Sequence, residues 1–474
     1  MSERREVMSH HSTDPPFTDL VADLTAELPP DVLVTDHDRL GSYQRDMASF
    51  CPAGKPVAAV LAREVGQVQR VMVLASRHGV PVVPQGGRTG LSGGANAIDG
   101  CLILSLERMD RIVEIDPANR IAVVQPGVKN AHLSRAVVEH GLFYPPDPSS
   151  WEISTIGGNL ATNAGGLCCV KYGVTSDFVR SLEVVLASGE ILRTGRRTAK
   201  GVAGYDLTRL FVGSEGTLGV ITEATLALRP ASQEPRTVAA LFPTVAAAGD
   251  AVARVVASGQ VPSLLEFMDQ ASLRAANAYR PMGLPEHAAA MLIAQSDAVG
   301  EQAAADIAAT AAVFADAGGF DVVEADDAAE GELLLAARRE MHFALERLAT
   351  GRLIDDVCVP VSRLADFVQQ VETVAAHVDL TIAVVGHAGD GNVHPNVVFD
   401  ADDEDQARRA RQAFDEIMRL GLAMGGTVTG EHGVGMLKRD WLAQELGPVS
   451  LRVHHDLKRL FDPEGILNPG KVLA

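Results

Sequence analysis

Short apolar runs alternate with glycine-rich loops and helical stretches between about residue 56 and residue 230. Residues 65–79, VGQVQRVMVLASRHG, carry apolar side chains at helical spacing and end in glycine, which predicts an amphipathic helix with a glycine C-cap. IVEIDPANRIAVVQPG (112–127) predicts a β-hairpin that turns at Asp-Pro-Ala-Asn. The shorter runs VPVVP and CLILSL predict strands.

The pattern changes after Pro230. Alanine-rich segments with helical periodicity (residues 245–259 and 301–319) alternate with the strand-like runs TVAALF, SLLEFMD, AAMLIAQ and TIAVVG. This alternation predicts an α+β domain in which an antiparallel sheet has helices on one face. The last stretch, FDPEGILNPGKVLA, is rich in turn residues and apolar residues.

Size and charge limit the classes of function. A chain of 474 residues predicts two or three domains, and 47% hydrophobic residues suffice for well-filled cores. The net charge of −20, with one dense basic cluster at 193–200, argues against a nucleic-acid partner. No apolar run approaches the roughly 20 residues that span a bilayer.

The N-terminus and the cysteines favour a location in the cytoplasm. Residues 1–16, MSERREVMSHHSTDPP, are polar and no apolar h-region follows, so we expect a disordered lead-in rather than a secretory signal. The five cysteines include one adjacent pair and form no C-x-x-C motif. This pattern favours a reduced cytoplasmic protein and excludes an iron–sulfur cluster built by this chain alone.

Three glycine-rich loops lie beside strand-like sequence, at residues 85–95, 157–166 and 213–219. Glycine allows backbone N–H groups to approach an anionic group closely, so three such loops favour a cofactor that carries phosphate. The G-K-[ST] of a P-loop is absent, and the first loop leads into a strand rather than the helix of a Rossmann fingerprint. With the P-loop and the Rossmann fingerprint excluded, the hypothesis that fits the three loops is a dinucleotide site of another type.

Several long motifs resemble, in order, the FAD domain of the vanillyl-alcohol oxidase / p-cresol methylhydroxylase flavoproteins. These motifs are PVVPQGGRTGLSGGA, PPDPSSWEISTIGGNLATNAGG, VKYGVTSDFVRSLEVVLASGEI and GYDLTRLFVGSEGTLGVITEATL. The resemblance implies an FAD-binding domain of two subdomains. In some relatives a histidine of the first loop binds FAD covalently; Arg88 stands at that position here, so we expect dissociable FAD.

The same resemblance implies which residues contact FAD. The first loop would hold the diphosphate, the segment from Pro146 to Gly166 would line the flavin ring and ribityl chain, and the third loop would hold the nucleotide end. The predicted contacts are Pro84, Gly86, Gly87, Arg88, Thr89, Gly90, Leu91, Ser92, Gly93, Gly94, Pro146, Asp147, Ser154, Thr155, Gly157, Gly158, Asn159, Thr162, Asn163, Gly165, Gly166, Gly216, Gly219, Val220 and Asn468.

Two histidines, His387 and His394, flank a glycine-rich turn in GHAGDGNVHPNV. Strand-like runs on both sides predict a hairpin, and facing residues on paired strands are close enough for both imidazoles to reach one ion. Farther along, TVTGEHGVGMLKR supplies adjacent Glu431 and His432. Two imidazoles and one carboxylate make an open three-ligand site for Zn²⁺ or a similar divalent ion.

These motifs also resemble a narrower group, the flavin-dependent D-2-hydroxyacid dehydrogenases with a C-terminal cap domain. That resemblance implies His387, His394 and Glu431 as ligands of Zn or Mn, and His432 as the general base. It further implies Asn396 as a substrate contact and Arg338 as the clamp of the substrate carboxylate, with the adjacent Arg339 left open as an alternative.

The resemblance also implies the domain organisation and the substrate. We expect an N-terminal lead-in and helix (1–50), the FAD-binding domain (51–230), an α+β cap domain with an antiparallel, ferredoxin-like sheet (231–425), and a C-terminal segment that completes the active site and returns to the FAD domain (426–474). Relatives that oxidise D-2-hydroxyglutarate carry a lysine six residues before a proline, where GRLIDDVCVP has Ile354. This difference favours a short monocarboxylate, D-lactate or glycolate.

The electron acceptor could be a quinone, a cytochrome, an electron-transfer flavoprotein or a partner subunit, and the sequence does not select one of them. It also leaves open whether the chain forms a homodimer and whether a partner attaches it to a membrane. D-2-hydroxyglutarate dehydrogenase, the flavin subunit of a multi-subunit glycolate oxidase, a non-catalytic flavin subunit and a non-redox alkylglycerone-phosphate synthase are the alternatives. Alkylglycerone-phosphate synthases carry a run of histidines where this chain has Glu431 and His432.

Overall fold

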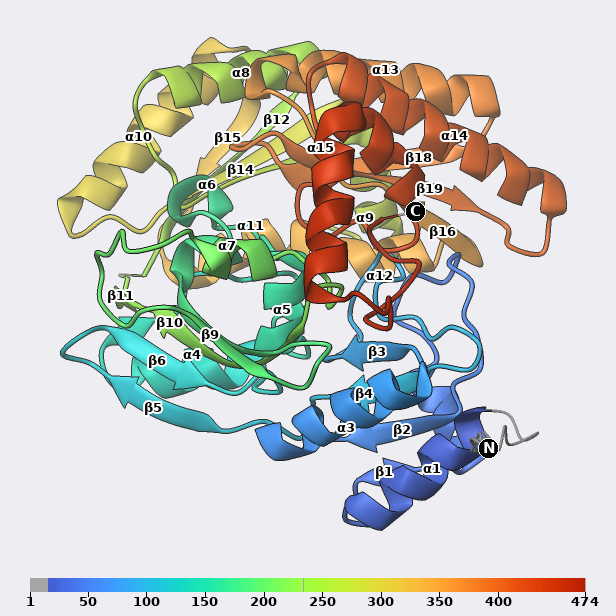
Figure 1. Cartoon of the computed structure of the whole chain (residues 1–474). Coiled ribbons are helices and arrows are strands. Elements are labelled where there is room, and N and C mark those ends of the chain that lie inside the picture. The colour runs from blue at the N-terminus through green and yellow to red at the C-terminus, as the bar shows by residue number, and fades with distance from the viewer. Residues whose placement is uncertain (1–15, 233, 474) are drawn as a thin grey trace, which may run out of the picture.

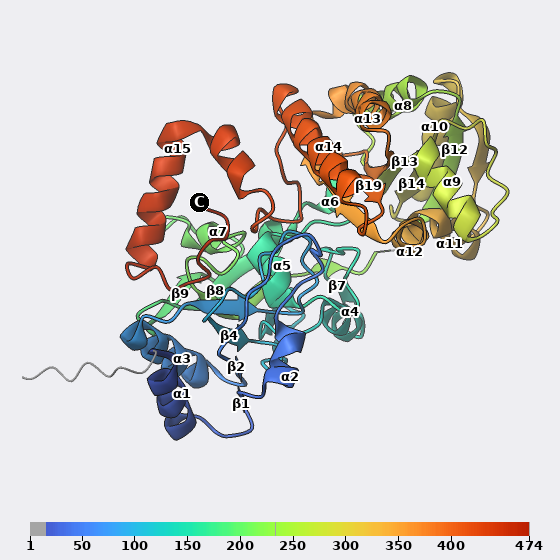
Figure 2. The same ribbon diagram turned by 90° about the vertical axis from the view of Figure 1, so that its right-hand side faces the viewer.

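The computed structural model describes residues 16–232 and 234–473, which form two halves (Figures 1 and 2). The expected lead-in at residues 1–15 lies outside the described residues. One half contains a small, mostly parallel sheet and a five-stranded antiparallel sheet, and the other contains a large antiparallel sheet covered by helices. These halves agree with the predicted two-subdomain FAD-binding domain and α+β cap domain.

The first subdomain is built on a sheet of order β1-β2-β4-β3, in which β2, β4 and β3 are parallel. The predicted amphipathic helix is α3 (Val65–His78), and it ends at Gly79 in the left-handed conformation that favours glycine (φ 63°). The other elements are α1 (Pro16–Glu27), β1 (Leu33–Val34), α2 (His37–Leu40), β2 (Ala58–Leu61), β3 (Val82–Gln85) and β4 (Leu102–Ser105).

The second subdomain contains an antiparallel sheet of order β5-β6-β10-β8-β9. The predicted hairpin is β5 (Ile112–Asp116) and β6 (Ile121–Val124). The other elements are α4 (Asn130–Val138), β7 (Leu142–Phe143), α5 (Ile156–Thr162), α6 (Cys169–Tyr172), β8 (Val179–Val185), β9 (Ile191–Gly195), α7 (Leu207–Phe211), β10 (Val220–Ala227) and β11 (Arg229–Pro230). The second glycine-rich loop therefore begins as the short helix α5.

The large sheet has the order β15-β12-β14-β13-β18-β19-β16, with β17 paired to β19. Its first four strands, with α8 and α10, follow the βαββαβ order of a ferredoxin-like unit, as predicted. Its strands are β12 (Arg236–Phe242), β13 (Leu264–Asp269), β14 (Ala290–Ser296), β15 (Phe320–Glu324), β16 (Gly351–Ile354), β17 (Val357–Cys358), β18 (Thr381–His387) and β19 (Asn392–Phe399).

The expectation that helices cover one face of this sheet is wrong. Side chains of α8 (Val245–Ala257), α10 (Glu301–Asp316), α13 (Leu364–Val378) and α14 (Glu404–Ala423) pack on one face, and those of α9 (Gln270–Tyr279), α11 (Ala328–Arg339) and α12 (Met341–Glu346) pack on the other (Figure 1). The reason is visible in the strands, because β13 and β14 are buried at every position instead of alternating.

After α14 the chain returns to the FAD-binding half through residues 424–438 and α15 (Arg439–Phe461), as Figure 2 shows. α15 is kinked at Gly447, which precedes Pro448. Its end packs on the second subdomain, where the rings of Phe461 and Phe211 lie 5.2 Å apart. No helix within the described ranges is both long and apolar enough to cross a membrane.

Candidate active site

The three glycine-rich loops, which are far apart in the sequence, meet in the FAD-binding half. Gly86 lies so close to the second loop that a Cβ would stand 3.2 Å from the backbone nitrogen of Gly158. Asn468, near the end of the chain, connects the first and third loops: its Nδ2 donates to Gly94 O at 2.9 Å and to Glu215 O at 2.7 Å. The loops and Asn468 therefore form one cradle.

Buried polar atoms in this cradle test whether it fits FAD. Ser154 Oγ, Asn159 Nδ2 and Asn468 Oδ1 are buried and, within the described part of the chain, have no hydrogen-bond partner. Buried polar atoms are usually partnered in folded proteins, so these three need a polar ligand or water. The cradle fits a long polar cofactor such as FAD.

The other predicted FAD contacts fall into three groups. The first comprises Pro84 in β3 and the contacts of the first loop. The second comprises residues 146–147, 154–155 and α5 with the turn that follows it, and the third comprises Gly216 and Gly219 of the third loop and Val220 at the start of β10. The Arg88 side chain is engaged elsewhere, with Nη1 2.7 Å from Glu107 Oε2 and its guanidinium over the Tyr43 ring, so its backbone is the part that borders the cradle. Val220 lies in β10 with its side chain in a hydrophobic core.

The two histidines lie on the same face of the β18–β19 hairpin, but they are not directly opposite each other. His387 pairs with Asn392, and His394 pairs with Val385. The histidines are therefore diagonal neighbours, and their rings are 5.3 Å apart. The prediction of a hairpin is confirmed, whereas the assumption of directly facing positions is wrong.

One carboxylate oxygen of Glu431 contacts the imidazoles of both His387 and His394. Its Oε1 lies 3.3 Å from His387 Nε2 and 3.2 Å from His394 Nε2. The ligand atoms of these three residues all lie within 4.8 Å of one another. Two imidazole nitrogens and a carboxylate oxygen in this arrangement fit a divalent ion with open coordination positions.

Charges within the cluster shift the pKa values. Burial alone would lower the pKa of His387, but the carboxylates of Glu266 and Glu431 hold it well above its ordinary value. Burial would raise the pKa of Glu431, but hydrogen bonds from His387 and His394 hold it well below its ordinary value. Each shift thus comes from the attraction between buried imidazoles and carboxylates that lie in contact.

Glu266 in β13 joins the candidate metal site to the predicted substrate clamp. Its Oε1 lies 2.6 Å from His387 Nδ1, and its Oε2 accepts a hydrogen bond of 2.6 Å from Arg338 Nε. The Arg338 side chain is 9% exposed, whereas the Arg339 side chain is 56% exposed and pairs with Glu332 at the surface. The structure thus places Arg338, and not Arg339, in this cluster.

Asn396, the predicted substrate contact, lies on the same sheet face as the histidines. Its Nδ2 donates to His394 O at 2.7 Å, and it is paired in register with Ile354 of β16. The position at which the resemblance implies a contact with a second carboxylate, Ile354, therefore lies next to this asparagine.

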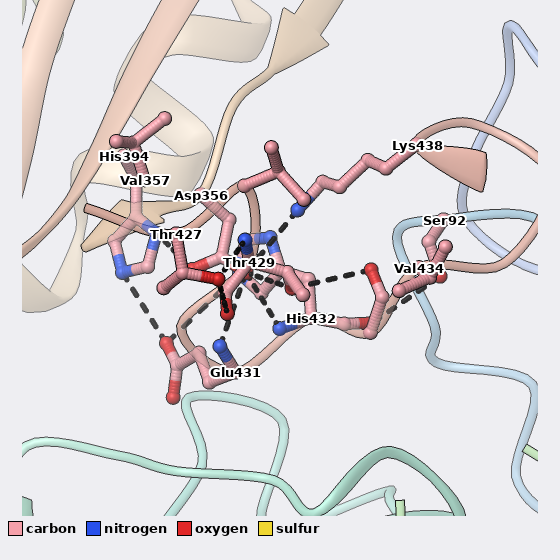
Figure 3. A network of polar contacts seen from close by, with 12 residues as sticks. Ser92, Asp356, Val357, His394, Thr427, Thr429, Glu431, His432, Val434 and Lys438 are labelled. Carbon is pink, nitrogen blue, oxygen red and sulfur yellow. Dashed lines mark hydrogen bonds and ion pairs between the residues drawn. The ribbon is translucent and has the colours of Figure 1, made fainter. Parts of the chain in front are cut away.

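Asp356 organises the segment that carries Glu431 and His432 (Figure 3). This carboxylate is completely buried and lies 3.2 Å from the equally buried ammonium group of Lys438. Burial would raise the pKa of Asp356, but Lys438 and the neighbouring histidines hold it well below its ordinary value. Asp356 Oδ2 accepts hydrogen bonds from Thr429 Oγ1 at 2.7 Å, Glu431 N at 3.1 Å and His432 N at 2.8 Å.

The His432 ring stacks on the His394 ring, with centroids 4.9 Å apart and planes 12° from parallel. Burial lowers the pKa of His432 to about 4. The imidazole is therefore neutral near neutral pH, as a proton acceptor must be. Asp356, His394 and His432 also lie close enough to form a second possible ligand set, which shares His394 with the first.

The candidate metal site and the cradle are in direct contact. A Cβ on Gly165, a predicted flavin contact, would lie 2.7 Å from Glu431 Oε2. Ser92 Oγ of the first loop donates to His432 O at 3.2 Å. Glu215 of the third loop accepts hydrogen bonds from the backbone of Val434 and Gly435. A flavin in the cradle would therefore border the histidine cluster.

Our sequence analysis did not identify Glu266, Asp356, Lys438 or Glu215 as site residues. For Glu266 a signal existed, because it is a charged residue inside the apolar strand sequence LLEFMD, and a buried charge requires a partner. A similar signal existed for Asp356, which with Asp355 interrupts the apolar run LIDDVCVP; only the fold, however, brings Asp356 and Lys438 together.

Comparison with known families gives two matches. Residues 56–195 match the FAD binding domain, and residues 231–472 match the C-terminal domain of FAD linked oxidases. Together these matches cover most of the chain.

Named relatives are similar over almost their whole length. The glycolate oxidase subunit GlcD of Bacillus subtilis (strain 168) is 43% identical, covering 93% of this chain and 92% of that protein. The D-lactate dehydrogenase of Anaerostipes hadrus is 37% identical, covering 94% and 95%. The crystal structure of p-cresol methylhydroxylase with substrate bound shares the fold, with a TM-score of 0.81 over 98% of each chain at 21% identity.

Proposed function

The chain belongs to the FAD-linked oxidase family, and on this premise we propose that it oxidises a short D-2-hydroxyacid, D-lactate or glycolate, to the 2-oxoacid. In this proposal residues 51–230 hold FAD, residues 231–425 hold the substrate, and residues 426–474 complete the site. The observation that carries the proposal is the convergence of two imidazoles and Glu431 beside the glycine cradle, with Arg338 joined to the same cluster.

Arg338 would bind the substrate carboxylate. Its Nε is fixed by Glu266, and among the described residues no side chain is hydrogen-bonded to its two terminal nitrogens. A guanidinium that is held in this way can bind a carboxylate through two parallel hydrogen bonds. Asn396 would provide a second polar contact, and Ile354 would limit the substrate to one carboxylate.

His387, His394 and Glu431 would hold a divalent ion, Zn or Mn, which when bound lowers the pKa of the substrate hydroxyl. FAD, when bound, accepts the hydride that leaves C2 of the substrate. His432 would take the hydroxyl proton at Nε2, the nitrogen that faces Glu431 at 3.9 Å. Its neutral state near neutral pH supports this role.

Two alternatives are disfavoured by specific residues. A D-2-hydroxyglutarate dehydrogenase would need a cation near the second carboxylate, and Ile354 offers none. An alkylglycerone-phosphate synthase would carry a histidine run in place of Glu431 and His432. A flavin subunit of a larger glycolate oxidase is compatible with the proposal, because it performs the same half-reaction and differs in the electron acceptor.

Anaerobic mixing of the isolated, FAD-loaded chain with D-lactate or glycolate tests this proposal. We expect the absorbance of oxidised flavin to disappear, while L-lactate leaves it unchanged. His432→Ala should keep FAD and lower the reduction rate by roughly 10²–10⁴-fold. A loaded wild-type protein that no 2-hydroxyacid reduces would refute the proposal.

A further inference from the structure

We propose that two buried carboxylates, Glu266 and Asp356, are positioning residues for the candidate metal site: Glu266 aims His387 Nε2 at Glu431, and Asp356 holds Glu431 and its loop against the strand of His394. The inference rests on the proposed function in one respect, namely that His387, His394 and Glu431 hold a divalent ion. It adds which residues prepare the site for that ion and how they connect it to the substrate clamp and the base.

Each histidine of the pair has a buried carboxylate on its Nδ1 side. Glu266 Oε1 is hydrogen-bonded to His387 Nδ1 at 2.6 Å. Asp356 Oδ1 lies 3.6 Å from His394 Nδ1, too far for a hydrogen bond, so its influence on His394 is that of a nearby charge and of the loop it holds. An imidazole that donates its Nδ1 hydrogen to a carboxylate keeps the lone pair on Nε2, which is the atom that can bind a metal. The two Nε2 atoms are also the atoms that converge on Glu431.

Glu266 performs a second task. Its side chain is completely buried, and its two oxygens are divided between His387 and Arg338. Burying a carboxylate is costly unless charged partners compensate, and here both partners belong to the candidate site. Glu266 therefore fixes the substrate clamp relative to the metal ligands.

Asp356 acts through the loop that carries Glu431 rather than through the substrate clamp. The backbone N–H groups of Glu431 and His432 both point to its Oδ2 (Figure 3). Its Oδ1 accepts a hydrogen bond of 2.9 Å from Asn392 Nδ2, at the start of β19. One carboxylate thus connects the strand of His394 with the loop that carries the third ligand and the base.

The chain offers a matched control for each carboxylate. Asp269 is buried in the same strand as Glu266, but it caps α9 through the backbone of Ser272. Asp355 precedes Asp356 and is equally buried. Replacement of either control residue removes a buried carboxylate without touching the histidines.

The test compares Glu266→Gln and Asp356→Asn with Asp269→Asn and Asp355→Asn. Equilibrium dialysis of the FAD-loaded proteins against Zn²⁺ or Mn²⁺, without substrate, measures metal affinity directly. We expect Glu266→Gln and Asp356→Asn to lose about 10- to 100-fold in affinity, while both controls stay within about twofold of wild type. Thermal unfolding and bound FAD serve as checks of the fold.

Kinetics at saturating metal separate the two roles. Glu266→Gln should mainly raise KM, because Arg338 loses its anchor, whereas Asp356→Asn should mainly lower kcat, because His432 shifts. Unchanged metal affinity in Glu266→Gln and Asp356→Asn, or equal losses in all four variants, would overturn the proposal. A wild-type chain that oxidises hydroxyacids but binds no divalent ion would also overturn it. A chain that shows the affinity pattern but oxidises no hydroxyacid would refute the proposed function alone.

Discussion

The guanidinium of Arg338 and the carboxylate of Glu266 form a buried ion pair, with Nε and Oε2 2.6 Å apart, on the sheet face that also carries His387. This pair places Arg338 at the candidate site and supports it as the clamp over Arg339, which the sequence left open as an alternative. Arg339 points to the surface from the next position of the same helix.

Replacing these two arginines should therefore have unequal effects. Arg338→Lys keeps the charge but loses the planar pair of donors, so we expect kcat/KM to fall by about tenfold or more, mostly through KM. Arg339→Ala removes a surface ion pair and should change kcat/KM by less than about twofold. Steady-state kinetics on both variants decide the matter, and equal losses would mean that Arg338 is not the clamp.

Metal removal should separate catalysis from flavin binding. Because the cradle and the histidine cluster use different residues, a chelator should abolish hydroxyacid oxidation while FAD stays bound. Zn²⁺, Mn²⁺ or Co²⁺ should restore the rate in wild type but not in His387→Ala. Full activity in protein that elemental analysis shows to be free of metal would contradict the ligand assignment.

FAD should be dissociable. The Arg88 guanidinium is occupied by Glu107 and Tyr43, and a guanidinium forms no covalent bond to the flavin. Acid precipitation should therefore release yellow FAD into the supernatant, where its absorbance can be measured. Flavin colour that stays with the denatured pellet would show a covalent link.

Ile354→Lys should change the preference among substrates. Ile354 lies beside Asn396, and a lysine there would offer a charged partner to a second carboxylate. We expect the ratio of kcat/KM for D-2-hydroxyglutarate to that for D-lactate to rise by about tenfold or more, as one charge-assisted hydrogen bond would give.

The wild-type chain is the control for this substitution and should prefer D-lactate or glycolate. A wild-type preference for the dicarboxylate would indicate that another cation binds it. Arg352, two positions earlier in β16 and bound to His342 Nδ1 at 2.8 Å, is then the residue to replace.

Asp355 should make stability depend on pH. Both of its oxygens are buried and, among residues 16–232 and 234–473, have no hydrogen-bond partner, and burial raises the pKa of Asp355 well above its ordinary value. The folded state thus holds this proton more tightly than the unfolded chain does. The contribution to stability is complete below the ordinary pKa of about 3.9 and is lost as pH rises through the folded value.

Asp355→Asn cannot ionise, so its Tm should rise relative to wild type as the pH is raised from about 5 to about 9. Thermal unfolding at several pH values measures the difference. A constant difference between the two proteins across this range would show that Asp355 does not titrate there.

Elements with a local signal were predictable from the sequence. The glycine-capped helix α3 and the hairpins β5–β6 and β18–β19 depend on residues close together in the chain. Helices on both faces of the cap sheet were not expected, although the uninterrupted apolar strands TVAALF and AAMLIAQ indicate burial on both sides.

The residues of the candidate site also divide into those with a local signal and those without one. The two histidines and the Glu431–His432 pair stand in short polar motifs that the sequence shows directly. Glu266 and Asp356 contact them across 121 and 76 positions of sequence, and no local pattern predicts such contacts. The choice between Arg338 and Arg339 likewise required the orientation of α11 relative to the sheet.

The order of the residues along the chain has a consequence for biosynthesis. Both large sheets are complete once β19 ends at Phe399, but Glu431, His432 and Asn468 follow later. A growing polypeptide therefore carries most of its flavin cradle before it has the groups that complete the cluster beside it. Under the proposed function, a growing chain that still lacks Glu431 and His432 would lack the third metal ligand and the base, and so could not pass electrons from a hydroxyacid to flavin.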